Sequence, residues 1–436
     1  MNSKNQGFLD NFFKITERGS NIKVEMGAGL ATFMTMSYIL IVHPLIMKGA
    51  GMPANQVFTV TAITSCIFTL LMGLYAKLPF ALAPAMGSNA FLAMTLVGSG
   101  AVTWQQGLAM NFVSGVVFLI MSIFGFREVI VKFLPKSLKL GIGAAVGIFL
   151  IELGFKNGGL MKAVNGSVSI GDLSSPAAMT ALFGILITAI LTARKIKCDM
   201  LLGIVSATLI GIPLGVTKIP ASFIAMPSTI SDIALKLDFS NILSIKVLPI
   251  LFVFFVGDFF STLGTLLGVS EKAGLLDENG DLPDIQKPFL VDALGTVVGS
   301  AMGTTTITTF VESAAGVGAG GRTGLTAVST GILFFFSLFD LSPLALMVPA
   351  AATAPALIIM GILMLSGMRN IEYDNFTESF PVFFMIICTA FTNSISNGVG
   401  AGIISYAVVK LGAGKGKEVS IGLYILAAIM VFYFIK

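Results

Sequence analysis

The chain has 436 residues, of which 55% are hydrophobic and only 11% are charged, against about 25% charged in an ordinary soluble domain. This composition excludes a soluble globular protein. The net charge is +4 and the chain has a single histidine, which also excludes a histidine-rich metal site.

Residues 1–25 are predicted to form an arm on the cytoplasmic side of a membrane. The arm has four basic residues but no short apolar core followed by a cleavage site of small residues, so we predict that it is not a removable signal peptide. Within it, residues 7–18 are typical of a short amphipathic helix at the membrane surface.

Beyond the arm, apolar runs of about 17 to 25 residues recur, the length that crosses a ~30 Å hydrocarbon core as a helix. Seven of them fall at about 26–48, 53–76, 78–98, 103–125, 138–155, 177–194 and 198–216. After a loop at 217–247, predicted to be extracellular, seven more fall at about 248–269, 288–303, 305–321, 324–342, 344–367, 377–394 and 396–412. Residues 413–436 hold one further apolar segment. The fold class is therefore predicted to be an all-α polytopic membrane protein.

The basic residues indicate the orientation. With the N-terminus in the cytoplasm, 19 of the 26 Lys and Arg residues fall on the inside, which is the bias that membrane proteins show. The positive net charge is therefore a signal of topology, and no nucleic-acid partner is expected.

The third and tenth segments correspond to each other, and both are poor continuous helices. The third contains Pro79, Pro84 and Gly87, and the tenth is rich in Thr and Gly. The two sets of seven begin about 222 residues apart, an offset that carries Asn89 to a position next to Glu312. Because seven is odd, the second set enters the membrane from the opposite side, which predicts inverted repeats at 26–216 and 248–412. Interrupted segments at matching positions of such repeats indicate a transport site at the membrane midplane.

Glu312 follows the run TTTITTFV, in which threonines and other β-branched residues favour extended backbone. Such backbone is tolerated at membrane depth only where it is buried in protein or lines a cavity, because unpaired backbone groups are costly in lipid. We therefore predict a short strand and then a half-helix from Ser313. An acid at this depth is a functional residue by default; the alternative is that Glu312 only caps the half-helix.

Asp258 lies in the middle of the eighth segment, between phenylalanines. A carboxylate buried there must be paired, hydrogen-bonded or protonated, which suits a proton carrier; the alternative is a hydrogen-bond partner in helix packing. Ser261 and Thr262 lie one turn later, where their hydroxyls either bond back to the helix or reach the same cavity.

Asn89 can donate and accept hydrogen bonds at once, which suits the edge of a heteroaromatic base. The alternative is that it caps the half-helix that follows the Pro and Gly break. His43 is predicted to be a capping or interface histidine near the outer end of the first segment. Five further acids are predicted to be solvated at the interface near segment ends or loops: Glu152, Asp199, Asp292, Asp340 and Glu378.

The run GVGAGG after Glu312 formally matches the dinucleotide-binding pattern G-x-G-x-x-G. That pattern must follow a strand of a parallel sheet, open a helix and precede an acidic residue by about 20 positions. Here the flanking segments are transmembrane, so we reject a nucleotide site. Small residues at this spacing instead allow helices to approach closely in lipid.

These motifs resemble those of the AzgA-like purine permeases, a branch of the nucleobase–ascorbate transporter superfamily that also includes the bacterial uracil permease. The similarity extends over nearly the whole chain. Its main blocks are TFMTMSYIL in the first segment, APAMGSNAF in the third, DFFSTLGTLLG in the eighth, TTFVESAAGVGAGGRTGLTAV in the tenth, VPAAATAPALIIMGILM in the twelfth and NGVGAGIISYAV near the end.

The resemblance implies fourteen core segments in two inverted seven-helix repeats, with short antiparallel strands in the third and tenth. It also implies a core domain that carries the substrate and moves like an elevator against a gate domain, each built from both repeats. The nucleobase would bind between the two strands. The implied substrate-binding residues are Asn89, Ala90, Asp258, Thr262, Phe310 and Glu312, and proton coupling would fall on Asp258 and Glu312.

The chain departs from the family pattern in two places. Ser261 stands where a second aspartate is usual, and Ser88 stands where a larger apolar residue commonly precedes the asparagine. Both departures bear on substrate preference and on the details of coupling, while Asp258 and Glu312 remain.

The sequence therefore predicts a purine nucleobase importer of the cell inner membrane, driven by proton symport. Guanine and hypoxanthine are favoured, with adenine as a further substrate. Phe91 or Phe310 would offer a ring face to the purine. No cofactor is expected besides the proton, and a homodimer stays an open alternative. The rival hypothesis is a transporter of anions or other small solutes with the same inverted-repeat fold. A membrane enzyme would need a nucleophile–base pair or a metal cluster, which one peripheral histidine and scattered cysteines do not offer, and a structural or receptor role would not explain acids placed in both repeats.

Overall fold

The structure is a computed structural model that describes residues 7–124, 135–164, 167–196, 198–220, 226–240, 242, 244, 247–277, 282–340, 347–392 and 394–435. Within these ranges the protein is mainly helical, with two sheets of two antiparallel strands each. One small sheet, β1 with β4, joins the two halves of the sequence at the centre of the protein.

The first half of the chain runs from α1 to α10. Its elements are α1 (Phe8–Phe13), α2 (Ile22–Met36), α3 (Ile39–Gly49), α4 (Ala54–Leu71), η1 (Met72–Ala76), β1 (Leu82–Pro84), α5 (Met86–Ala90), η2 (Phe91–Val97), α6 (Trp104–Phe124), α8 (Lys136–Asn157), β2 (Met161–Val164), β3 (Ser167–Ile170), α9 (Pro176–Ala193) and α10 (Asp199–Gly211).

The second half begins at α11. Its elements are α11 (Leu248–Ala273), α12 (Gln286–Met302), β4 (Ile307–Thr309), α13 (Ser313–Gly318), α14 (Gly324–Asp340), α16 (Ala350–Leu365), η4 (Ser366–Asn370), α17 (Phe376–Thr392), α18 (Ile395–Gly412), η5 (Gly416–Glu418) and α19 (Ile421–Ile435).

The helices follow the predicted segments to within a few residues at most ends. In the described residues, seven helical stretches are long and apolar enough to cross a membrane, and shorter apolar helices such as α10, α14 and α17 accompany them. The third and tenth predicted segments each consist of a strand followed by a short helix. The protein is therefore a multi-pass membrane protein by composition and by fold.

Three local features differ from the sequence prediction. The first segment is interrupted between α2 and α3, where Ser37 and Tyr38 lie outside both helices. The predicted amphipathic helix at residues 7–18 is shorter than expected and ends at Phe13. The hairpin of β2 and β3 was not predicted, because a four-residue strand carries too short an alternation to stand out beside long helices.

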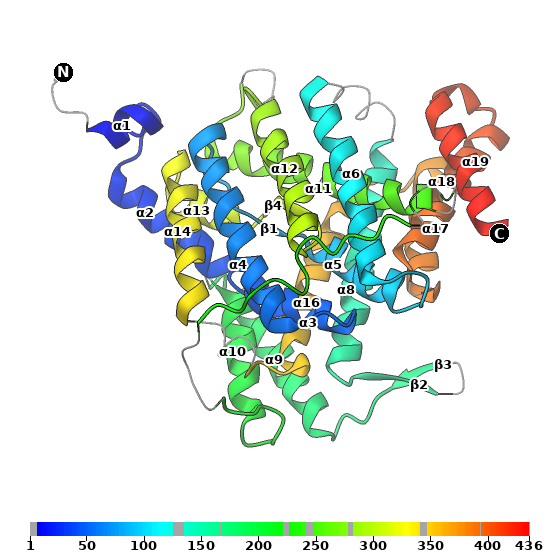
Figure 1. Ribbon diagram of the computed structural model, residues 1–436. Helices are drawn as coiled ribbons and strands as arrows, with labels where there is room; N and C mark the ends of the chain where they lie inside the picture. The colour runs from blue at the N-terminus through cyan, green and yellow to red at the C-terminus, as the bar shows by residue number, and fades with distance from the viewer. Residues whose placement is uncertain are drawn as a thin grey trace.

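The helices pack in two groups. In the first group α2 and α4 pack against α14, and α12 packs against α6 and β4. In the second group α16 packs against α8, α9 and α10, and α17 packs against α8 and α18. Figure 1 shows β1 and β4 side by side between α4 and α12, within the first group.

Small residues allow the closest of these contacts. A Cβ atom added to Gly147 of α8 would lie 2.7 Å from the carbonyl oxygen of Gly361 in α16. Glycine pairs of this kind bring helix backbones together where the hydrophobic effect contributes little to association. The predicted packing role of GVGAGG is confirmed in the same way, because an added Cβ at Gly316 would lie 2.7 Å from the carbonyl oxygen of Ala28 in α2.

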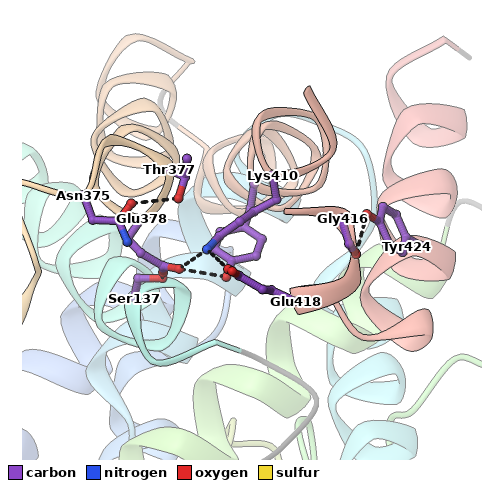
Figure 2. Close-up of polar contacts among 9 residues, drawn as sticks. Ser137, Asn375, Thr377, Glu378, Lys410, Gly416, Glu418 and Tyr424 are labelled. Carbon is purple, nitrogen blue, oxygen red and sulfur yellow. Dashed lines mark hydrogen bonds and ion pairs between the residues drawn. The ribbon is translucent and has the colours of Figure 1, made fainter. Parts of the chain in front are cut away.

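An ion cluster around a buried lysine holds the end of the chain to the second group. Lys410 of α18 is 2% exposed, and its ammonium lies 2.7 Å from Glu378 of α17 and 2.6 Å from Glu418 of η5. Figure 2 shows Lys410 pointing between the two carboxylates. Tyr406 and Ser137 donate hydrogen bonds to Glu378. Glu378 lies near the start of its segment, as predicted, and is 19% exposed, but its carboxylate is not simply solvated: it balances a buried cation, as such a cation requires.

Candidate functional site

The strands β1 and β4 form the centre of the candidate site. They pair in antiparallel register, with Leu82 opposite Thr309 and Pro84 opposite Ile307. The strand predicted from TTTITTFV is confirmed, and so is the half-helix from Ser313. Because the strands are antiparallel, the short helices α5 and α13 leave the sheet at opposite ends. Backbone polar groups are satisfied here by strand pairing, which is what buried irregular backbone needs.

Threonines ahead of the strand fix its position from one side. Thr305 donates a hydrogen bond to Asn89 Oδ1 in α5. The hydroxyl of Thr306 donates to Asn111 Oδ1 in α6 at 2.8 Å. Both threonines are fully buried, so each would cost free energy if it had no partner. The threonine run thus serves two purposes, since it favours a strand and ties that strand to its neighbours.

Asn89 keeps part of its hydrogen-bonding capacity free. Its side chain is fully buried, Oδ1 accepts from Thr305, and Nδ2 has no partner among the described residues. The two amide atoms are assigned by hydrogen bonding, and with either assignment one of them stays without a partner. A buried polar atom in this state is a position from which a ligand can be bound.

Glu312 lies at the start of α13 and turns toward the first helical segment. The hydroxyl of Tyr38 donates a hydrogen bond to Glu312 Oε1 at 2.7 Å. Glu312 occupies the N-cap position, yet its side chain makes no capping hydrogen bond. The alternative that this carboxylate only caps the half-helix is therefore wrong. Tyr38 was not predicted as a site residue; the signal was a tyrosine within an otherwise apolar segment.

Asp258 and Asp292 lie together behind β4, on α11 and α12. Asp258 is 3% exposed and Asp292 is fully buried. Thr296 donates a hydrogen bond to Asp258 Oδ2 at 2.8 Å, and the backbone N–H of Thr309 donates to Asp292 Oδ1 at 3.0 Å. The prediction that Asp292 is solvated at the interface is wrong. It lies only two turns from the start of α12, but β4 covers it.

Thr262 of α11 faces the strand. Its hydroxyl lies 2.7 Å from the hydroxyl of Thr308 in β4, and both residues are buried. Of the two orientations left open by the sequence, the one toward the site is correct. Ser261, in contrast, is exposed. The missing second aspartate of the family pattern therefore falls on a face of α11 that points away from this buried set.

His43 is part of the same buried core. Its Nδ1 lies 2.8 Å from the hydroxyl oxygen of Thr61, and that hydroxyl is 2.6 Å from the carbonyl oxygen of Val57, to which it donates. Nδ1 therefore carries the proton, and Nε2 accepts from Thr304 at 3.3 Å. The prediction of a capping or interface histidine is wrong, because the side chain is fully buried and joins α3, α4 and the approach to β4.

The remaining predicted residues also lie at or near the strands. Ala90 is fully buried, and Phe310 directly follows β4 and is 6% exposed. Phe91 packs edge-on against Phe254 of α11, with ring centroids 4.9 Å apart. The helix α11 packs against α5, α13 and β4, so the elements that carry Asn89, Asp258 and Glu312 meet at one place. The side chain of Asp340 lies outside the described residues.

Comparison with known proteins identifies the chain. Residues 23–401 match the permease family. The chain belongs to this family. The permease is 39% identical over 427 residues to the adenine permease AdeP of Escherichia coli, an alignment that covers 98% of this chain and 96% of AdeP. It is 38% identical over 428 residues to the guanine/hypoxanthine permease PbuO of Bacillus subtilis, covering 96% and 98% of the two chains.

The fold has a solved counterpart. The transmembrane domain of the cyanobacterial bicarbonate transporter BicA superposes with a TM-score of 0.64 at 13% sequence identity, over 87% of this permease and 97% of that domain. At this identity the likeness concerns the fold alone. Family membership makes the protein a transporter and not an enzyme.

Proposed function

We propose that this permease imports purine nucleobases together with protons. The observation that carries the proposal is the pair of polar groups beside the paired strands β1 and β4. These are the Asn89 amide, which has one unpartnered atom, and the Glu312 carboxylate, which is oriented by Tyr38. The proposal is supported by the substrates named for AdeP and PbuO, which are adenine and guanine or hypoxanthine.

The chemistry of these groups suits a purine. An ionised carboxylate only accepts hydrogen bonds, and an amide nitrogen only donates them. Guanine and hypoxanthine present a ring N–H beside a carbonyl oxygen, so Glu312 would accept from the ring and Asn89 would donate to an acceptor on its edge. Adenine offers its amino group to the carboxylate. We therefore place guanine and hypoxanthine first and adenine second, with Phe310 next to the ring.

The two helix groups suggest how the bound substrate would move across the membrane. We propose that the group containing β1 and β4 is the core, which carries the purine, and that the group built on α8 and α16 is the gate. The inverted repeats predicted at 26–216 and 248–412 would then contribute to both, with the N-terminus in the cytoplasm. Protonation of a buried acid would remove a charge that is costly to move through the membrane.

Replacement of Glu312 tests the binding site. Glu312→Gln keeps the shape but puts a donor where the purine needs an acceptor. A hydrogen bond to a charged group contributes about 1.5–3 kcal/mol, so uptake of labelled hypoxanthine or guanine should fall at least about tenfold. The host should lack purine uptake of its own. Glu372→Gln, on an exposed residue, is the matched control, and undiminished accumulation by Glu312→Gln would contradict the proposal.

The rival substrate class is a small anion, because BicA shares the fold. Two acids near the paired strands, Asp258 and Glu312, disfavour a negatively charged substrate. An excess of sulfate or bicarbonate should therefore leave labelled purine uptake unchanged, whereas unlabelled guanine or hypoxanthine should compete. Competition by the anions alone would favour the rival function.

A further inference from the structure

Two buried carboxyl groups lie close together behind the central strand. Asp292 and Thr296 lie one turn apart on the same face of α12, and Thr296 donates to Asp258 Oδ2 of α11, so the carboxyl groups of Asp258 and Asp292 lie close together. One oxygen of each already accepts from Thr296 or from the backbone of Thr309. The other two oxygens, Asp258 Oδ1 and Asp292 Oδ2, have no donor among the described residues.

Among the described residues, no basic group balances this pair. None of the ion pairs formed by the described residues includes Asp258 or Asp292. By sequence, β4 and the packed helices α5 and α6 carry no ionisable residue, α4 carries only Cys66 and η1 only Tyr75. Glu312, at the start of α13, is acidic and is bonded to Tyr38. The lysines of α8, α11, α12 and α18 stand at or near the ends of their helices, and Glu152 of α8 is paired with Lys156.

Electrostatics favours a proton on this pair. Two ionised carboxylates in contact repel strongly in a buried setting, and such pairs titrate as one unit that holds a single proton. One proton between the two unpartnered oxygens supplies the missing donor, removes one charge and removes the repulsion.

We propose that Asp258 and Asp292 hold one proton between them and that this is the proton coupled to purine import. The inference rests on the proposed function and deepens it by adding Asp292, a residue that the sequence placed at the interface. The pair connects to the purine site through β4, because Asp292 accepts from Thr309 N, next in the chain to Phe310. Loss of the shared proton would leave two negative charges behind β4 and would change the contacts that hold this strand.

Asp292→Asn tests the pair, because it imitates the protonated state. The new amide oxygen can still accept from Thr309 N, and the amide nitrogen can donate permanently to Asp258 Oδ1. In proteoliposomes with an interior about one pH unit more alkaline, one proton per purine supports roughly tenfold accumulation, since one unit is worth about 1.4 kcal/mol. We expect the variant to equilibrate labelled purine, within about tenfold of the wild-type exchange rate, but to accumulate none.

Two further variants complete the design. Asp284→Asn, an exposed position just before the same helix, should accumulate purine like the wild type. Asp258→Asn can keep the bond from Thr296 and donate to Asp292 Oδ2, so it should lose accumulation as Asp292→Asn does. Protection of each protein from thermal unfolding by guanine shows that it is folded and binds.

The outcomes separate this inference from the proposed function. If the wild type takes up no purine, the proposed function fails. If the wild type and Asp292→Asn both accumulate purine about tenfold, only the shared-proton inference is overturned. If neither variant folds, the infrared C=O stretch of the wild type decides: a protonated carboxyl band at neutral pH that shifts on purine binding supports the pair, and its absence overturns it.

Discussion

Tyr38 shows how a break in a helix supplies a site residue. It lies between α2 and α3, where the first segment is interrupted, and its hydroxyl reaches Glu312 at 2.7 Å across 274 positions of sequence. A tyrosine inside an unbroken apolar helix would have been directed by helix geometry alone. Because the helix is interrupted there, regular helix geometry does not direct the Tyr38 side chain, and the full burial of its ring holds it in place.

Removal of this hydroxyl should weaken purine binding. Tyr38→Phe keeps the buried ring but leaves Glu312 Oε1 without its donor, so the carboxylate is less well oriented. We expect the KM for guanine or hypoxanthine uptake to rise roughly tenfold, since a hydrogen bond to a charged group contributes about 1.5–3 kcal/mol, with little change in the amount of protein in the membrane. Tyr75→Phe, on an exposed tyrosine, is the control. Equal KM values for Tyr38→Phe and the wild type would show that the hydroxyl does not support the site.

At this scale the sequence predicted the environment of some residues correctly and misjudged that of others. Asp258 and Glu312 were predicted because an acid in the middle of an apolar segment is conspicuous. Asp292 and His43 were misjudged because they lie near segment ends, where a residue is usually solvated. Burial there comes from β4 and from the residues just before it, which belong to another part of the sequence, and segment position alone does not reveal such cover.

Among the elements, the sheet of β1 and β4 was predictable because two independent signals agree. Pro79 and Pro84 exclude a continuous helix in the third segment, and the threonine run favours extended backbone in the tenth. Their antiparallel pairing came only from the family resemblance and is confirmed by the structure. The partner of each threonine was not predictable, because it depends on how α5, α6 and α11 pack around the strand.

Helix packing in the second group gives a test with a control in the same helix. A Cβ at Gly147 would lie 2.7 Å from the Gly361 carbonyl oxygen and 3.0 Å from Met364, whereas a Cβ at Gly143 meets nothing within 4 Å. Gly147→Ala should force α8 and α16 apart and destabilise the protein by roughly 1–3 kcal/mol. Gly143→Ala should be neutral or slightly stabilising, since Ala favours helix by about 1 kcal/mol over Gly.

Thermal unfolding in detergent, followed by the loss of monodisperse protein, measures both glycine variants. The melting temperature of Gly147→Ala should be several degrees below that of Gly143→Ala. The reverse order, or equal melting temperatures, would mean that the contact between α8 and α16 is not as close as described.

For the whole molecule, the division of helices into two groups is the feature that relates fold to transport. The polar residues of the candidate site come from the first group, which contains β1 and β4, and from α11, which packs against α6 of that group. The cluster around Lys410 holds the second group to the end of the chain. The elevator that we propose needs one rigid body that carries the substrate and another against which it moves. The proposed elevator assigns one group to each part.

The most direct test of the central claim is proton movement driven by purine. Purified permease in liposomes, with equal pH on both sides and a pH-sensitive dye outside, should alkalinise the external medium when guanine or hypoxanthine is added, with about one proton taken up per purine. Sulfate should produce no change. Purine uptake without proton uptake would contradict proton symport, and the absence of any purine uptake would contradict the proposed function itself.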